Sequence, residues 1–186
     1  MTMSAFDPKR TSRRLAANDP KQPSIAHPEY ILGSKLQCPN WSKAVADLKD
    51  LLGTWTMLSW KKEIIATGQI VDALGPDPIG YITYGADGRM HAIVVRRDRL
   101  APETLPPTAP EKLRLFDSML AYSGTYTLDD EKVIHHVDVS WNQAFTKTAL
   151  IRFYKLANGI LTITAAPAID PYSGKEVIHR MEFRKA

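Results

Sequence analysis

Two adjacent histidines, His135 and His136, stand in a stretch whose side chains could bind a small molecule or act on one. An imidazole titrates near neutral pH and can both donate and accept hydrogen bonds. Successive side chains of an extended strand point to opposite faces. One face carries Val133, His135, Val137, Val139 and Trp141, and the other carries Ile134, His136, Asp138 and Ser140. The two imidazoles therefore cannot both face one interior.

Two arrangements of this strand remain open. If the apolar face is inside, His135 is a single polar group in an apolar pocket, with Trp141 on the same face. If the other face is inside, His136 and Asp138 begin a polar row. His91 and Arg152, on neighbouring predicted strands, favour the polar-lined cavity. In the purely structural alternative, one imidazole is a hydrogen-bonded core group and the other is solvated.

Arg152, Arg180 and Arg184 are the candidate anion-binding residues, because a guanidinium pairs with carboxylates in fixed geometry. Of the three, Arg152 is the better candidate. It shares a strand face with Leu150 and Tyr154, and we count Tyr154 among the predicted ligand contacts. His91, His179 and either His135 or His136 lie on different predicted strands, and nothing in their spacing makes three ligands converge, so we predict no metal site. Motifs for a nucleophile or a phosphate loop are absent from the sequence, so we predict no cofactor.

Short alternating segments separated by turns are the elements that must position these side chains. The predicted strands are Gly53–Lys62, Gln69–Ala73, Ile79–Tyr84, Arg89–Arg96, Tyr122–Leu128, Lys132–Trp141, Thr146–Leu156, Ile160–Ala165 and Lys175–Arg184. A capping box at Thr108–Glu111 starts one mid-chain helix that we expect to reach about Ala121. A leading helix is predicted over Trp41–Asp50. We predict an all-β fold, a closed or nearly closed antiparallel up-and-down barrel of eight to nine strands.

The first 40 of the 186 residues contain five prolines and few periodic apolar positions. We predict a disordered or loosely docked basic leader over 1–40 and one domain over 41–186. Residues 1–50 carry a net charge of +3 and residues 51–186 a net charge of +1. A nearly neutral domain argues against nucleic acid as a partner. No apolar run is long enough for a membrane span, and none has the position of a secretory signal, so we expect a cytoplasmic protein whose single cysteine, Cys38, is reduced.

Five segments resemble the lipocalin-like domain family, in the same order along the chain. They are Leu51–Trp55, Gly75–Tyr81, Tyr84–Met90, Ala121–Tyr126 and His135–Ser140. The resemblance implies a barrel around a small-molecule cavity. It also implies that Gly53 and Trp55 form a structural plug, and that a late-strand arginine, Arg180 or Arg184, packs over Trp55.

Three functions follow as alternatives from these observations. The first is binding of a small, mostly apolar molecule, bearing a carboxylate or hydroxyl group, in the barrel cavity. The second is a cofactor-independent enzyme, such as a cyclase, isomerase or hydratase, using a cavity His or Asp. The third is an interaction module that uses the basic leader. The oligomeric state is not indicated by the sequence.

Overall fold

The computed structural model describes residues 48–129 and 131–186. In chain order the elements are α1 (Leu48–Leu51), β1 (Gly53–Ile64), β2 (Gln69–Asp72), β3 (Ile79–Tyr84), β4 (Arg89–Val95), α2 (Ala109–Asp117), β5 (Met119–Leu128), β6 (Lys132–Ser140), the 3-10 turn η1 (Gln143–Phe145), β7 (Ala149–Ala157), β8 (Ile160–Ala165), β9 (Ala168–Ile169) and β10 (Glu176–Lys185). The predicted leader, Cys38 and most of the predicted leading helix lie outside the described residues.

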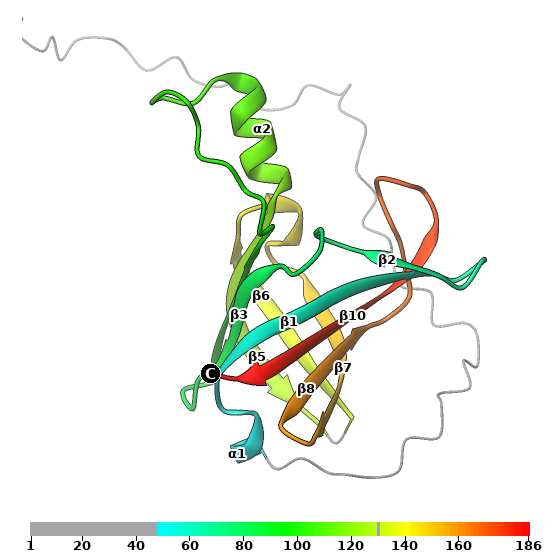
Figure 1. Ribbon diagram of the computed structural model, residues 1–186. Helices are drawn as coiled ribbons and strands as arrows, with labels where there is room; N and C mark the ends of the chain where they lie inside the picture. The colour runs from blue at the N-terminus through cyan, green and yellow to red at the C-terminus, as the bar shows by residue number, and fades with distance from the viewer. Residues whose placement is uncertain (1–47, 130) are drawn as a thin grey trace, which may run out of the picture. The chain divides into compact units, whose positions relative to one another are not determined.

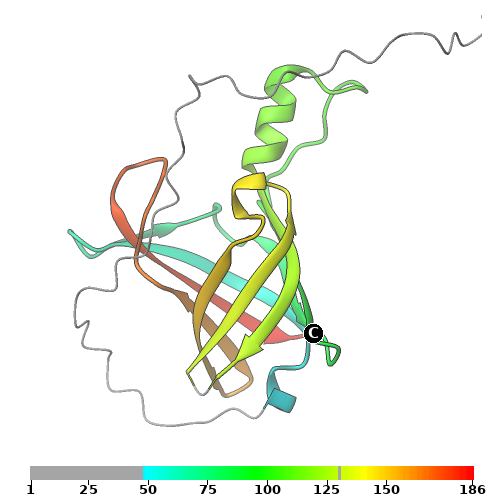
Figure 2. The ribbon, with the colours of Figure 1, turned by 180° about the vertical axis from the view of Figure 1, so that it is seen from behind.

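Eight antiparallel strands close into a barrel, as the sequence predicts. The order is β1-β3-β4-β5-β6-β7-β8-β10, and β10 pairs again with β1. Figures 1 and 2 show this barrel from opposite sides. The short strands β2 and β9 extend the sheet beside β1 and β10. In the described residues each barrel strand pairs with a neighbour on both sides, and closing the sheet in this way removes its open edges, which is the physical advantage of this architecture.

The two ends of the barrel differ. Helix α1 and the C-terminus lie at one end, while α2 and η1 lie at the other (Figures 1 and 2). The tight turn after Tyr84 joins β3 to β4 at the α1 end, while the longer connection from β4 to β5, which carries α2, lies at the other end (Figure 1). No helix in the described ranges has both the length and the apolar character needed to cross a membrane.

Helix α2 begins as the capping box predicts and ends earlier than expected. Glu111 accepts hydrogen bonds from the backbone N–H and the hydroxyl of Thr108 at 2.8 and 2.7 Å. The helix stops at Asp117, and Met119–Ala121, expected to be helical, begin strand β5 instead. Their backbone groups pair with Ile93–Val95 of β4, so sheet pairing overrides the helical pattern at this boundary.

A β-bulge interrupts the alternation of strand β6. Ser123 of β5 pairs with Val139, while the next residue, Gly124, pairs with Val137, so Asp138 is the extra residue on β6. Val133, His135 and Val137 are buried, but Val139 is 59% exposed. The bulge therefore breaks the face that strict alternation predicts for Val133–Trp141. Gly124 permits the close approach of the two strands, because a Cβ there would overlap the carbonyl oxygen of His136.

Candidate functional site

His135 lies inside the barrel between two tyrosine hydroxyls. Its side chain is fully buried at 0% exposure. Its Nε2 atom is 2.9 Å from the hydroxyl oxygen of Tyr84, at the end of β3. Its Nδ1 atom is 2.9 Å from the hydroxyl oxygen of Tyr122 on β5. Three strands thus contribute one continuous hydrogen-bonded row, Tyr84–His135–Tyr122.

Burial keeps this row uncharged. Burial, together with the positive charge of Arg152, holds the pKa of His135 well below its ordinary value. Burial raises the pKa of Tyr84 and of Tyr122, and Arg152 acts in the opposite direction on both. At neutral pH His135 is therefore a neutral imidazole, with one N–H donor and one acceptor nitrogen. One tyrosine donates to it and the other accepts from it.

A cavity of about 150 Å³ lies beside Tyr122 and His135. All eight barrel strands contribute to its lining, together with Phe145 of η1. Most of the lining side chains are aliphatic or aromatic, including Met57, Ile82, Val94, Ile163 and Phe183. A mostly apolar cavity with a few polar groups is the usual composition of a small-molecule site.

Arg152 brings a positive charge to this cavity. It is partly buried on the inner face of β7 and lines the cavity together with His135. Its Nη1 atom donates a hydrogen bond to the carbonyl oxygen of Ile151 at 3.1 Å. Within the described residues no carboxylate lies within 4.0 Å of its guanidinium. A guanidinium at an apolar cavity without a carboxylate is poised to pair with an anionic group of a ligand.

His179 on β10 is the second cavity imidazole, and Trp60 on β1 fixes its hydrogen-bonding state. The indole N–H of Trp60 donates to Nδ1 of His179 at 3.0 Å. Burial, and then the charges of Lys62 and Arg152, lower the pKa of His179 to about 4, against a smaller opposing effect of Asp170. His179 is therefore neutral at pH 7. Because its Nδ1 accepts, its hydrogen is on Nε2, which adds another donor beside the cavity.

The sequence profile of the lipocalin-like domain family matches residues 52–184. The chain belongs to this family. A search of curated proteins finds no match. Among solved structures, the chain is similar to a lipocalin-like protein from Bacteroides uniformis, with a TM-score of 0.40 and 15% identity over 74% of this chain and 99% of the other.

Three of the predicted ligand contacts lie on the outer wall of the lipocalin-like barrel. His91 pairs with Ser123 at 2.8 Å, His136 pairs with the hydroxyl of Thr127 at 3.0 Å, and Asp138 forms an ion pair with Arg89. The preference for a polar-lined cavity was therefore wrong. Val133 and Val137 flank His135 on the apolar face of β6, and burying that face places His136 and Asp138 in solvent.

Trp141 and Tyr154 do not line the cavity either. Trp141 follows β6, stacks on Phe145 at a centroid distance of 5.4 Å, and donates its indole N–H to the carbonyl oxygen of Phe116 at 3.2 Å. Tyr154 is buried, with its hydroxyl 3.4 Å from the carbonyl oxygen of Asp129 near the hairpin that joins β5 to β6. Of the seven predicted contacts, the structure brings His135 and Arg152 to the cavity, and contact of either with a ligand stays a prediction.

The predicted plug lies at the α1 end of the barrel. Trp55 is 2% exposed and donates its indole N–H to the carbonyl oxygen of Leu51 at 2.8 Å. Gly53 has a φ of +106°, a conformation that side-chain-bearing residues rarely adopt. The cation over the Trp55 ring is Lys185, whose Nζ lies 4.3 Å from the ring centroid. The same Nζ donates a hydrogen bond to the carbonyl oxygen of Leu52.

The expectation that Arg180 or Arg184 covers Trp55 is therefore wrong. Both arginines are exposed. Trp55 pairs with Lys185 across β1 and β10, while Arg184 pairs with Thr56 and so belongs to the opposite face. Which residues of β10 share a face with Trp55 depends on the β1–β10 register. The sequence of either strand alone does not specify that register.

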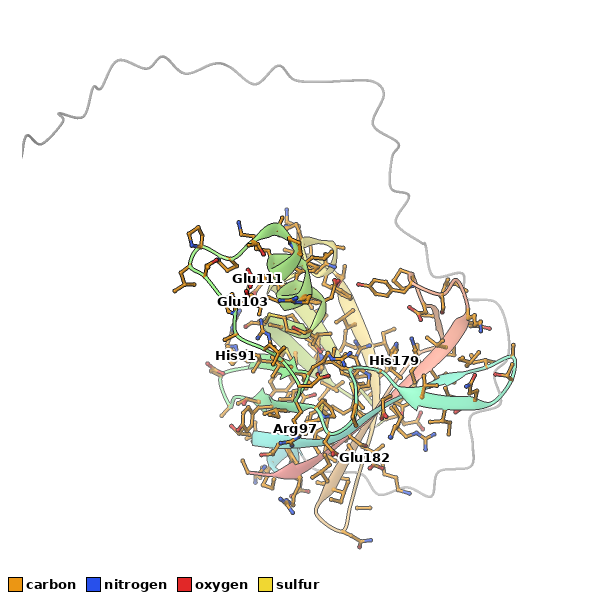
Figure 3. All side chains as sticks on the ribbon, turned by 45° about the horizontal axis from the view of Figure 1, so that its top comes forward. His91, Arg97, Glu103, Glu111, His179 and Glu182 are labelled. Atoms are coloured by element: carbon orange, nitrogen blue, oxygen red, sulfur yellow. The ribbon has the colours of Figure 1, made fainter. Side chains whose placement is uncertain are left out.

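Three residues that line the cavity, and one more residue of the hydrogen-bonded row, are not among the contacts predicted from the sequence: Trp60, Tyr122 and His179, and Tyr84. Alternation along β5 was the available signal, because it gives Tyr122, Gly124 and Tyr126 a common face. No group of three or more His, Cys, Asp or Glu in the described part of the chain could hold a metal ion. His91 on β4 and His179 on β10 stand on separate parts of the barrel wall (Figure 3).

Proposed function

We propose that this protein binds a small, mostly apolar molecule in the barrel cavity, and that a negatively charged or strongly accepting oxygen of the ligand pairs with Arg152. The observation that carries the proposal is that Arg152, a partly buried residue, lines an apolar cavity and has no carboxylate of the described residues within 4.0 Å of its guanidinium. A charge removed from water is costly unless it is paired. An anionic ligand would supply that pairing, and the apolar wall would bury the rest of the molecule.

Cavity size limits the ligand. A volume of about 150 Å³ equals that of an engineered protein cavity that accepts benzene. The expected ligand therefore has the size of one six-membered ring with a short polar substituent. Benzoate has this size and carries the expected charge, so it is a suitable probe of the site.

The cofactor-independent enzyme is supported less well than binding. The Tyr84–His135–Tyr122 row is the observation in favour of acid–base chemistry. However, both nitrogens of His135 are engaged, and Nδ1 of His179 is occupied by Trp60. No Asp or Glu is among the described residues that line the cavity. General-base catalysis needs a free acceptor close to the substrate, so the donors at this cavity favour binding over turnover. The interaction module would use the leader and stays a prediction.

Calorimetric titration with benzoate and with neutral benzamide tests the proposed function. We expect benzoate to bind at least tenfold more tightly, because a hydrogen bond to a charged group contributes about 1.5–3 kcal/mol. Arg152→Met removes the charge and keeps an apolar stem, and it should abolish the preference. Arg180→Met, on the exposed face of β10, is the matched control and should keep the preference. Equal binding of both probes, or unchanged benzoate binding by Arg152→Met, would contradict the proposal.

A further inference from the structure

We propose that the cavity binds weakly acidic hydroxyl compounds, phenols and enols, as their anions, because Nδ1 of His135 carries the imidazole hydrogen and the hydroxyl hydrogen of Tyr122 turns into the cavity. This inference rests on the proposed function and names the ligand class for the same site. It follows from the hydrogen-bonding capacity of each group in the Tyr84–His135–Tyr122 row.

The Tyr84 end determines which nitrogen of His135 carries the hydrogen. The Tyr84 side chain is 0% exposed, and His135 Nε2 is the one hydrogen-bond partner of its hydroxyl within residues 48–129 and 131–186. If Nε2 carried the hydrogen, Tyr84 would accept it, and its own buried hydroxyl hydrogen would have no acceptor. An unsatisfied buried donor is costly. Tyr84 therefore donates to Nε2, and the hydrogen of the neutral imidazole is on Nδ1.

The Tyr122 end follows from this assignment. The Nδ1–H group of His135 donates to the hydroxyl oxygen of Tyr122 across 2.9 Å. Tyr122 must then direct its own hydrogen elsewhere. Its side chain lines the cavity, as do Arg152 and His179. The hydroxyl hydrogen of Tyr122 thus joins the guanidinium and the Nε2–H group of His179 as donors on one small cavity.

A site of donors discriminates between the two protonation states of a hydroxyl ligand. A neutral phenol brings a hydrogen that needs an acceptor, and the described lining residues include no carboxylate. The phenolate brings only acceptor lone pairs and a negative charge that Arg152 balances. On binding, the O–H bond of the ligand breaks, its electron pair stays on the ligand oxygen, and the proton leaves to the solvent. No covalent bond to the protein forms.

The tautomer of His135 can be measured directly. In the ligand-free full chain, nitrogen-15 NMR should show a neutral His135 imidazole with its hydrogen on Nδ1, and His135→Asn identifies the signal by its loss. A hydrogen on Nε2, or a doubly protonated ring at pH 7, would overturn the proposal. This result is independent of any ligand.

The ligand class is tested with 4-nitrophenol, whose anion absorbs visible light and whose neutral form absorbs in the near ultraviolet. We expect its pKa to fall by at least one unit when bound, which means a tenfold or greater preference for the anion. Tyr122→Phe should lose most of that fall, while Tyr172→Phe, which alters an 85% exposed side chain, should keep it. Binding of 4-nitrophenol with an unchanged or raised pKa would overturn this inference and leave benzoate binding intact. Failure of both probes to bind would overturn the proposed function and this inference with it.

Discussion

The indole N–H of Trp60 donates a hydrogen bond to Nδ1 of His179 over 3.0 Å, joining β1 to β10 at the cavity wall. Only a neutral His179 can accept this hydrogen bond. A protonated His179 would carry a hydrogen on Nδ1 as well, and two N–H donors would then face each other. The pKa of His179 is correspondingly lowered, mainly by burial, to about 4.

The first prediction is that stability decreases as pH falls from about 6.5, the pKa of histidine in an unfolded chain, to about 4. Between these values the unfolded chain binds more protons than the folded one, so the free energy of unfolding rises with pH. His179 contributes up to about 3 kcal/mol over this window, and His135 acts in the same direction because its pKa is also lowered.

Urea denaturation of the wild type and of His179→Asn at several pH values checks this prediction. The asparagine oxygen can still accept from Trp60, but the side chain does not titrate. Between pH 4 and 6.5, the slope of the free energy of unfolding against pH should therefore be smaller in the variant. The decrease should correspond to about one proton fewer taken up on unfolding. Identical slopes would show that His179 is not the group responsible.

The barrel and its closure were predictable because each strand signals its own limits. Alternating apolar residues mark the strands, and Asp87-Gly88 marks one hairpin. Placement inside the barrel was harder to predict at His135 and His136, since each face of β6 carries one imidazole and a strand alone does not show which face is buried. The bulge at Asp138 also reverses which side chains of β6 face the interior beyond that point. It depends on the pairing of Gly124 with Val137, which the sequence of β6 alone does not show.

The site was predictable residue by residue only where chemistry and burial point to the same residue. Arg152 was found because an arginine between apolar side chains on one face is unusual. The pairing of His135 with Tyr84 and Tyr122 was not predictable, because these residues are far apart in sequence and their hydroxyls meet only when the barrel closes. The contact between Lys185 and Trp55 depends in the same way on long-range register.

The second prediction concerns the ion pair between Lys62 of β1 and Asp170, which follows β9. Their charged atoms are 2.7 Å apart, and Asp170 also accepts from the hydroxyl of Ser173 at 2.8 Å. Several effects lower the pKa of Asp170 to about 2, and the hydrogen bond that Lys62 donates is the largest of them. Burial acts in the opposite direction. The stability that the carboxylate contributes is thus complete above about pH 4, the pKa of an unfolded aspartate, and is lost as pH falls through about 2.

Asp170→Asn should lower the free energy of unfolding at pH 7 by about 1–2 kcal/mol, a value reduced by the 22% exposure of Lys62. The difference from the wild type should shrink as the pH approaches 2. Asp72→Asn is the matched control, because its pair with Lys61 lies in solvent, and it should cause little change. Equal effects of the two variants at pH 7 would contradict this account.

The third prediction separates the predicted barrel plug from the cavity that we propose binds a ligand. Trp55 is buried at the α1 end and does not line the cavity. Trp55→Ala should lower the free energy of unfolding by about 3–5 kcal/mol, while Lys185→Met, which removes the cation over the ring, should cost less than about 1 kcal/mol. Chemical denaturation measures both values. Benzoate affinity of the folded protein should be the same in both variants. Unchanged stability with lost benzoate binding in Trp55→Ala would show that Trp55 belongs to the ligand site.

The last prediction concerns an aromatic row at the α2 end of the barrel. Phe116 of α2 lies 5.7 Å from Trp141 between ring centroids, and Trp141 stacks on Phe145 of η1 at 5.4 Å. Of these three rings, Phe145 alone lines the cavity. We therefore expect Phe145 to be the side chain of this row that limits the size of a ligand in the cavity.

Phe145→Ala should let the cavity accept 2-naphthoate, and the affinity ratio of 2-naphthoate to benzoate should rise at least tenfold over the wild type. Stopped-flow measurements should also show faster association and dissociation of benzoate, because a ring that lines the cavity is removed. Phe116→Ala is the matched control, since it removes the ring on the other side of Trp141 and leaves the cavity lining intact. A similar rise in the naphthoate ratio in Phe116→Ala would assign ligand size selection to the whole row, and no rise in Phe145→Ala would place the size limit deeper in the barrel.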